Sequence, residues 1–100
     1  MGAVLFSSSL GRQVELTDER KKHIFQYHKD IIPFFDHMAE VLNSPDDVRR
    51  TLDDKQVVLF YRLYPDILAG KYFVAVVKIN ARNFILTAYL PRRVKTGEPL

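Results

Sequence analysis

The last third of the chain contains three runs of residues whose side chains alternate as they do in β-strands. The runs cover residues 57–64, 71–80 and 84–90, and they are rich in the β-branched and aromatic residues that favour strands. The segments between them, 65–70 and 80–83, contain Pro, Gly, Asp and Asn and are too short for the crossover that a parallel pair needs. The sequence therefore predicts three consecutive antiparallel strands.

Alternation divides each run into two sets, because successive side chains of a strand point to opposite faces. One set of each run is wholly apolar, and we expect these sets to share one buried face: Val57, Leu59, Tyr61 and Leu63, then Phe73, Ala75, Val77 and Ile79, then Phe84, Leu86, Ala88 and Leu90. The remaining sets are mixed. They predict a second face that carries two cations and two hydroxyl groups, and this face is the candidate site: Arg62, Lys78, Thr87 and Tyr89.

Two helices are predicted before these strands. Thr17 is a plausible N-cap for a helix over residues 18–29, and Pro33 suits the first turn of a second helix over residues 33–42. Residues 12–16 should be extended, and residues 49–55 should form a charged surface loop. Helices followed by consecutive strands indicate an α+β fold, with two N-terminal helices packed on one face of an antiparallel sheet of three to four strands.

The length of 100 residues indicates one domain. We expect residues 1–10 to be a flexible N-terminal arm and residues 11–100 to form the single domain, with its last ten residues either an ordered edge or a flexible end. Cysteine is absent, the first residues lack the pattern of a signal peptide, and no apolar run is long enough to cross a membrane. These features predict a soluble, cytoplasmic protein with no membrane association.

The net charge of +3 is unevenly distributed. Residues 1–56 hold eight Lys or Arg against ten Asp or Glu, whereas residues 57–100 hold seven against two, so the net charges are −2 and +5. A basic sheet and tail would attract RNA, DNA or an acidic protein partner, although an ordinary solvated surface accounts for the same charges.

Metal chemistry is disfavoured by the spacing of the histidines. His23 and His28 are five residues apart, which places them about 140° apart around a helix. We therefore predict no metal and no cofactor. The residues instead suit metal-independent cleavage of a phosphodiester, in which Arg62 and Lys78 hold the phosphate while Thr87 and Tyr89 orient it. His28 has two open interpretations: it points into the core, or it reaches the rim of the site as the acid or base.

Several short motifs, in this order along the chain, resemble the barnase-EndoU-colicin-RelE-like nucleases of phages and bacteria. They are Leu16-Thr17-Asp18-Glu19-Arg20, His23-Ile24, Tyr27-His28, Ser44-Pro45-Asp46-Asp47-Val48, Leu59-Phe60-Tyr61-Arg62, residues 72–78 ending in Lys78, Ile85-Leu86-Thr87-Ala88-Tyr89 and Lys95-Thr96-Gly97. The resemblance covers nearly all of the chain from Gly11 onward. It implies a RelE-like or barnase-like α+β fold and a metal-independent, toxin-type endoribonuclease, with functional positions at His28, Arg62, Lys78, Thr87 and Tyr89.

This chain departs from that family in two places. The helix histidine of such domains is often followed by Pro-Glu, whereas here His28 is followed by Lys29 and Asp30. A glutamate base on the sheet, as in barnase, is also missing. The expected partners are RNA (mRNA or tRNA) and an acidic antitoxin or immunity protein. The alternatives are a non-catalytic module that binds nucleic acid or protein on the same fold, and a toxin that acts by occupying a protein partner.

Overall fold

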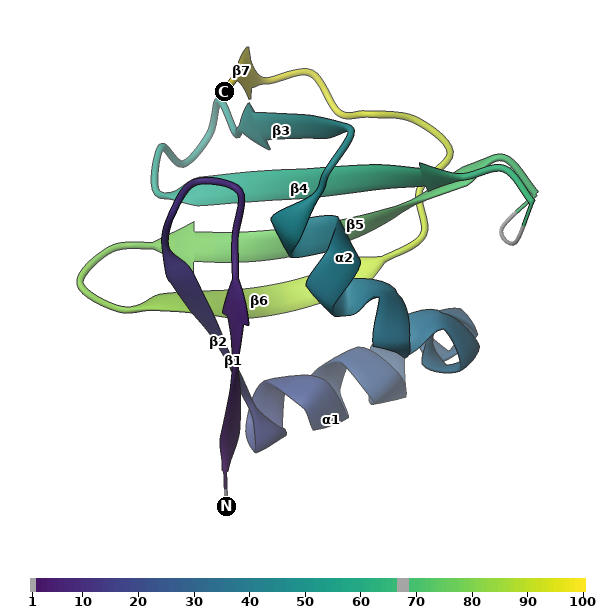
Figure 1. Cartoon of the computed structure of the whole chain (residues 1–100), viewed down its shortest axis with the longest axis horizontal. Coiled ribbons are helices and arrows are strands. Elements are labelled where there is room, and N and C mark those ends of the chain that lie inside the picture. The colour runs from purple at the N-terminus through teal and green to yellow at the C-terminus, as the bar shows by residue number, and fades with distance from the viewer. Residues whose placement is uncertain (1, 67–68) are drawn as a thin grey trace.

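The computed structural model describes residues 2–66 and 69–100 and contains a seven-stranded sheet with three helical segments (Figure 1). In chain order the elements are β1 (Ala3–Ser7), β2 (Gln13–Thr17), α1 (Asp18–Tyr27), the 3-10 helix η1 (Lys29–His37), α2 (Met38–Asn43), β3 (Asp47–Arg50), β4 (Val57–Tyr64), β5 (Lys71–Ile79), β6 (Asn83–Tyr89) and β7 (Glu98–Pro99). The strands lie in the order β1-β2-β6-β5-β4-β3-β7.

The predicted sheet of three to four antiparallel strands is wrong, because the sheet has seven strands and is mixed. β2 pairs with β6 in parallel, through Glu15 and Phe84. Two of the added strands come from segments that were expected to be a flexible arm or a loop, and a third comes from the tail, for which an ordered edge was one of the two alternatives. β1 lies within the expected N-terminal arm, β3 includes Arg49 and Arg50 from the expected loop, and β7 comes from the tail. Each of these strands is short, so its alternation is too brief to be recognised from sequence.

The predicted pairing of the three long strands is confirmed. β4 pairs with β5, and β5 with β6, both antiparallel, and they occupy the middle of the sheet. The β4–β5 connection, predicted over residues 65–70, lies partly outside the described residues.

The helical part differs from the two predicted helices. The backbone N–H of Arg20 donates to the Thr17 side-chain oxygen over 3.2 Å, which confirms Thr17 as the N-cap of α1. Pro33 lies inside η1 instead of opening a helix, and α2 has only six residues. No helix of the described ranges is both long and apolar enough to span a bilayer.

Both faces of the sheet are apolar, but they are covered differently. We call the face under the helices the covered face; Val58, Phe60, Phe73, Ala75 and Val77 are buried there against Ile24, Ile31, Met38, Val41 and Leu42. We call the opposite face the tail face. It buries Leu59, Tyr61, Val74 and Val76, with Val94 of the tail packed against them. The tail crosses this face between β6 and β7, and Figure 1 shows it in yellow passing behind the strands.

Hydrogen bonds to β4 and β5 hold the first half of the tail in place. The backbone N–H of Tyr72 donates to the Pro91 carbonyl over 2.8 Å, which extends the β5–β6 ladder beyond β6. The backbone N–H of Lys95 then donates to the Tyr61 hydroxyl over 3.0 Å. The tail is thus a structural layer of the tail face.

Candidate functional site

The structure separates the two cations that the sequence placed on one face. Arg62 pairs in register with Phe73, which belongs to the covered face, whereas Lys78 pairs with Val57 on the tail face. The predicted common face for Arg62 and Lys78 is therefore wrong. The reason is register: Leu59 lies opposite Val76, so odd-numbered residues of β4 share a face with even-numbered residues of β5.

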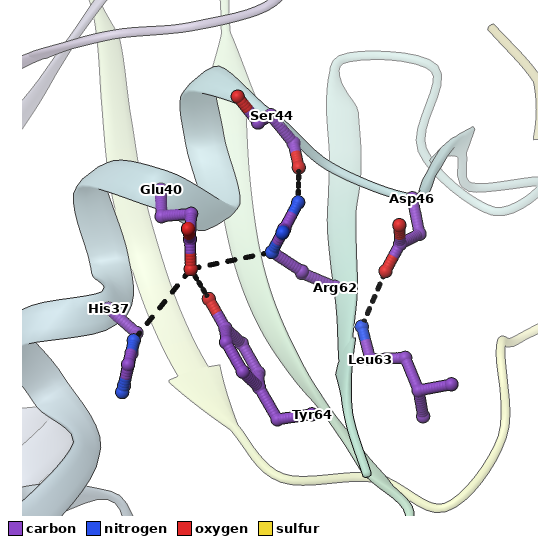
Figure 2. Close-up of polar contacts among 7 residues, drawn as sticks. All are labelled: His37, Glu40, Ser44, Asp46, Arg62, Leu63 and Tyr64. Atoms are coloured by element: carbon purple, nitrogen blue, oxygen red, sulfur yellow. Dashed lines mark hydrogen bonds and ion pairs between the residues drawn. The ribbon is translucent and has the colours of Figure 1, made fainter. Parts of the chain in front are cut away.

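Arg62 belongs to a polar cluster between α2 and β4, which we call the Glu40 cluster: His37, Glu40, Arg62 and Tyr64 (Figure 2). The Tyr64 hydroxyl donates to Glu40 Oε1 over 2.5 Å, and Arg62 Nε lies 3.4 Å from the same oxygen. His37 Nδ1 lies 3.8 Å from it, and an Arg62 guanidinium N–H donates to the Ser44 carbonyl over 2.5 Å. One carboxylate therefore gathers a phenol, a guanidinium and an imidazole.

The electrostatics of the Glu40 cluster favour an ionised Glu40 and a neutral Tyr64. The hydrogen bond from Tyr64, followed by the charges of Arg62 and His37, outweighs desolvation and lowers the pKa of Glu40. Burial, together with the hydrogen bond to Glu40, raises the pKa of Tyr64. Glu40 is consequently ionised and Tyr64 neutral near pH 7, and the cluster fastens α2 to β4 with its charges compensated.

Lys78 is also engaged by a carboxylate. Its Nζ lies 2.9 Å from Asp54 Oδ2 and donates to it, and this hydrogen bond is the largest cause that lowers the pKa of Asp54. A backbone hydrogen bond from Gln56 acts in the same direction. Lys78, on the tail face, is therefore already ion-paired with Asp54.

His28 and Tyr89 come together at the other end of the tail face. α1 ends where the His28 backbone N–H donates to the Ile24 carbonyl over 2.8 Å, which leaves the imidazole beyond the last turn. There it stacks on the ring of Tyr89, with centroids 5.6 Å apart and planes inclined by 29°. Of the two interpretations of His28, the structure places it at the rim of the sheet.

Thr87 follows next along β6. It lies opposite Val76, beside a register shift between Val76 and Val77, and its Oγ1 is buried without a hydrogen-bond partner among the described residues. Tyr89 lies opposite Val74 and Thr87 opposite Val76, so Tyr89, Thr87 and Lys78 follow one another along the β5–β6 pair at intervals of two β5 residues. They form a row on the tail face that is on the order of 14 Å long. The His28 end of this row brings an imidazole beside a phenol.

Two further cations follow Tyr89 closely in the amino-acid sequence. Arg92 and Arg93 follow Tyr89 by three and four residues, both are exposed, and neither makes an ion pair within residues 2–66 and 69–100. The Tyr72–Pro91 hydrogen bond fixes where this part of the tail begins. We call His28, Thr87, Tyr89, Arg92 and Arg93 the His28 site.

Sequence reasoning missed Glu40 and His37. A signal was present, because the two are separated by three residues in a predicted helix and lie outside its apolar positions, so their side chains had to be neighbours on the outer surface. The three-residue spacing alone did not show that Arg62 would meet them, since that contact depends on the face to which Arg62 points.

No three His, Cys, Asp or Glu side chains of the described residues gather in a way that could hold a metal ion. No protein-family model, curated protein or solved structure matches the chain. The resemblance to barnase-EndoU-colicin-RelE-like nucleases therefore stays a prediction.

Proposed function

We propose that this protein is a metal-independent, ribonuclease-like domain that acts on RNA (mRNA or tRNA) in the cytoplasm, with its chemistry at the His28 site. The observation that supports this proposal most strongly is the stacking of His28 on Tyr89, with ring centroids 5.6 Å apart. Imidazole is the side chain best suited to exchanging protons near neutral pH, and the phenol beside it can donate one.

The reaction would proceed by attack of the RNA 2′-oxygen on its own phosphate. A bond forms between the 2′-oxygen and phosphorus, and the bond from phosphorus to the 5′-oxygen breaks, which leaves a 2′,3′-cyclic phosphate. His28 takes the proton of the 2′-hydroxyl, and Tyr89 gives its phenolic proton to the departing 5′-oxygen. Proton transfer from His28 back to Tyr89 then restores both groups.

The remaining polar groups have supporting roles. Thr87 Oγ1 lacks a partner among the described residues but is buried, so it would donate to a phosphate oxygen only after the atoms that cover it move. Arg92 and Arg93 replace Arg62 and Lys78 as the cations that hold the phosphates, because the latter are each paired with a carboxylate, Glu40 and Asp54.

The test is a cleavage assay on labelled total RNA with EDTA present. His28→Ala should abolish cleavage, whereas His23→Ala should retain it, since the His23 ring lies tilted against the ring of Tyr27 in α1 and His23 is the matched control. Cleavage that persists in His28→Ala contradicts the catalytic assignment, and loss of cleavage in both variants indicates damage to α1.

A binding module without catalysis is the second candidate, favoured by Arg92 and Arg93, which are exposed and make no ion pair with any residue that the structure describes. Its signature is salt-sensitive RNA binding by the wild type with no cleavage product. An acidic antitoxin or immunity protein would compete for the same arginines, and its binding would weaken in the Arg92→Ala, Arg93→Ala variant.

A further inference from the structure

The strand β1 forms one edge of the sheet and is paired on one side only. β2 lies beside it, and within residues 2–66 and 69–100 no strand pairs with its other side. The unpaired side of an edge strand presents backbone N–H and C=O groups to which a further strand can bind. We call this side of β1 the free edge.

Hydrogen bonds at the two ends of β1 show which residues point to the free edge. The Asp18 N–H donates to the Gly2 carbonyl over 3.2 Å, and the Ser8 N–H donates to the Arg12 carbonyl over 3.0 Å. Both pairs continue the β1–β2 register. Opposite residues of antiparallel strands alternate between pairs with and without hydrogen bonds, so the even-numbered residues of β1 bond to β2. The backbone groups of the odd-numbered residues therefore point to the free edge: Ala3, Leu5 and Ser7.

The free edge opens into a groove beside α2. The N–H of Ser9, the next odd-numbered residue, donates to the Leu42 carbonyl over 2.8 Å, so α2 closes the edge just past β1. Before that point a groove of about 490 Å³ lies between residues 5–7 of β1 and residues 39–44 at α2. A strand that pairs with β1 would enter this groove.

The two edges of the sheet differ in their protection against pairing. Edge strands are commonly protected by charged side chains, by proline or by shortness. β7, at the opposite edge, has all three features, since it consists of Glu98 and Pro99. β1 has five residues, none of them charged and none proline, and its Val4 and Leu5 are 55% and 59% exposed. β1 is therefore the edge that is open to another strand.

We propose that the free edge binds β1 of a second copy of this chain, antiparallel, with the two-fold axis at Leu5. In this register Leu5 lies opposite Leu5 of the second copy, and Ala3 lies opposite Ser7. Each free N–H of one copy then meets a C=O of the other. Val4 lies opposite Phe6 of the second copy, and such a pair of a β-branched and an aromatic residue is favourable across strands. This inference does not rest on the proposed function.

The strand itself favours a second copy as the occupant. Residues 2–11 carry no charged side chain, so two copies of β1 do not repel each other. Pairing of β1 with β7 would instead build an open chain of copies, but β7 offers only two residues. One five-residue strand per copy is much smaller than the roughly 20–30 residues per side of a standard interface. We therefore expect a weak dimer, with a Kd of about 100 µM.

The test is sedimentation equilibrium of the wild type at concentrations from about 10 µM to about 1 mM, which bracket the expected Kd. Leu5→Lys places two like charges opposite each other and should weaken the dimer by about tenfold or more. Leu52→Lys is the matched control, because Leu52 is 68% exposed and lies outside the strands. It should dimerise as the wild type does.

A mixture of Leu5→Lys and Leu5→Glu tests the register. Residue 5 of one copy meets residue 5 of the other at the two-fold axis, so the mixture should dimerise with about the affinity of the wild type, while each variant alone dimerises weakly. Amide hydrogen exchange of the wild type gives an independent measurement. Exchange at Leu5 should slow as the protein concentration rises, whereas exchange at Phe6, which is bonded to β2, should be slow at every concentration.

A wild type that stays monomeric at about 1 mM overturns the inference and leaves the free edge to a strand of another protein. Equal weakening in Leu5→Lys and Leu52→Lys places any self-association elsewhere and also overturns it. A mixture of Leu5→Lys and Leu5→Glu that does not dimerise overturns the two-fold axis at Leu5. Far-UV circular dichroism shows whether each variant is folded, and the exchange experiment needs no variant.

Discussion

The Glu40 cluster and the His28 site each place a histidine beside a tyrosine, yet they differ in what surrounds the pair. In the Glu40 cluster the rings of His37 and Tyr64 lie 4.7 Å apart, and Glu40 binds both side chains. In the His28 site the rings of His28 and Tyr89 lie 5.6 Å apart, and neither side chain makes a hydrogen bond within the described residues.

This difference separates a structural role from a role in binding. Groups that are hydrogen-bonded or ion-paired to one another stabilise the fold and have less to offer a ligand, whereas the His28 imidazole and the Tyr89 phenol make no hydrogen bond among the described residues and are available for one. The arginines repeat the contrast, since Arg62 is held by Glu40 and Ser44 while Arg92 and Arg93 have no carboxylate partner in the part of the chain that the structure describes.

The largest expected effect comes from removing one hydroxyl from the His28 site. Tyr89→Phe keeps the ring that stacks on His28 but removes the phenolic proton, so RNA cleavage should fall by about 100-fold or more, as for the loss of a general acid. The midpoint of thermal unfolding should stay close to that of the wild type. Initial cleavage rates and a melting curve on the same samples check both statements. Cleavage within a few-fold of wild type would exclude Tyr89 as the acid.

A smaller effect is expected from the tail arginines. Arg92→Ala with Arg93→Ala should weaken RNA binding and reduce the slope of log affinity against log salt by about 1.4, because each contact of a cation with a single strand contributes about 0.7. Fluorescence anisotropy at several salt concentrations gives this slope. The matched variant is Arg62→Lys with Lys78→Arg, which keeps the charges of the two paired cations and should leave the slope unchanged. An unchanged slope in the tail variant would place the bound RNA elsewhere.

The three long strands were predictable because each contains seven or more alternating residues and a short connection. The sequence did not show which alternating set of β4 shares a face with which set of β5. In β4 both alternating sets are largely apolar, since the tail covers one face and the helices the other, so hydrophobicity does not decide whether Leu59 or Phe60 joins Ala75. The pairing of Tyr64 with Lys71 fixes this register, and a shift of one residue moves every side chain to the other face.

The candidate site could also be predicted only in part from the sequence. Thr87 and Tyr89 share a face wherever β6 lies, because they are two residues apart in one strand, and Lys78 joins them through the β5–β6 pairing. Arg62 was misplaced by the register of β4. The contact of His28 with Tyr89 depends on how far α1 extends past β6, which no local pattern of residues specifies.

Removal of the hydroxyl from the Glu40 cluster should change stability instead of activity. Tyr64→Phe loses the hydrogen bond to Glu40 and should lower the free energy of unfolding by about 0.5–1.5 kcal/mol, with RNA cleavage unchanged. Urea denaturation at pH 7 measures the change. Tyr27→Phe is the control, because Tyr27 is 65% exposed and its hydroxyl should contribute little. A loss of cleavage in Tyr64→Phe without a loss of stability would reverse the roles of the two regions.

The smallest effect is the pH dependence of that stability difference. The pKa of Glu40 is lowered in the folded state, chiefly by the hydrogen bond from Tyr64, so folding favours the ionised carboxylate. Its contribution is fully present above the ordinary value of 4.5 and is lost as the pH falls through the lower folded pKa. The difference in unfolding free energy between wild type and Tyr64→Phe should therefore be constant from pH 7 to about pH 5 and shrink below pH 4. Urea denaturation at pH 7, 5 and 3.5 follows it. A difference that stays constant at pH 3.5 would show that Tyr64 does not depend on an ionised Glu40, and the contrast between a satisfied cluster and an open site would then rest on the arginines alone.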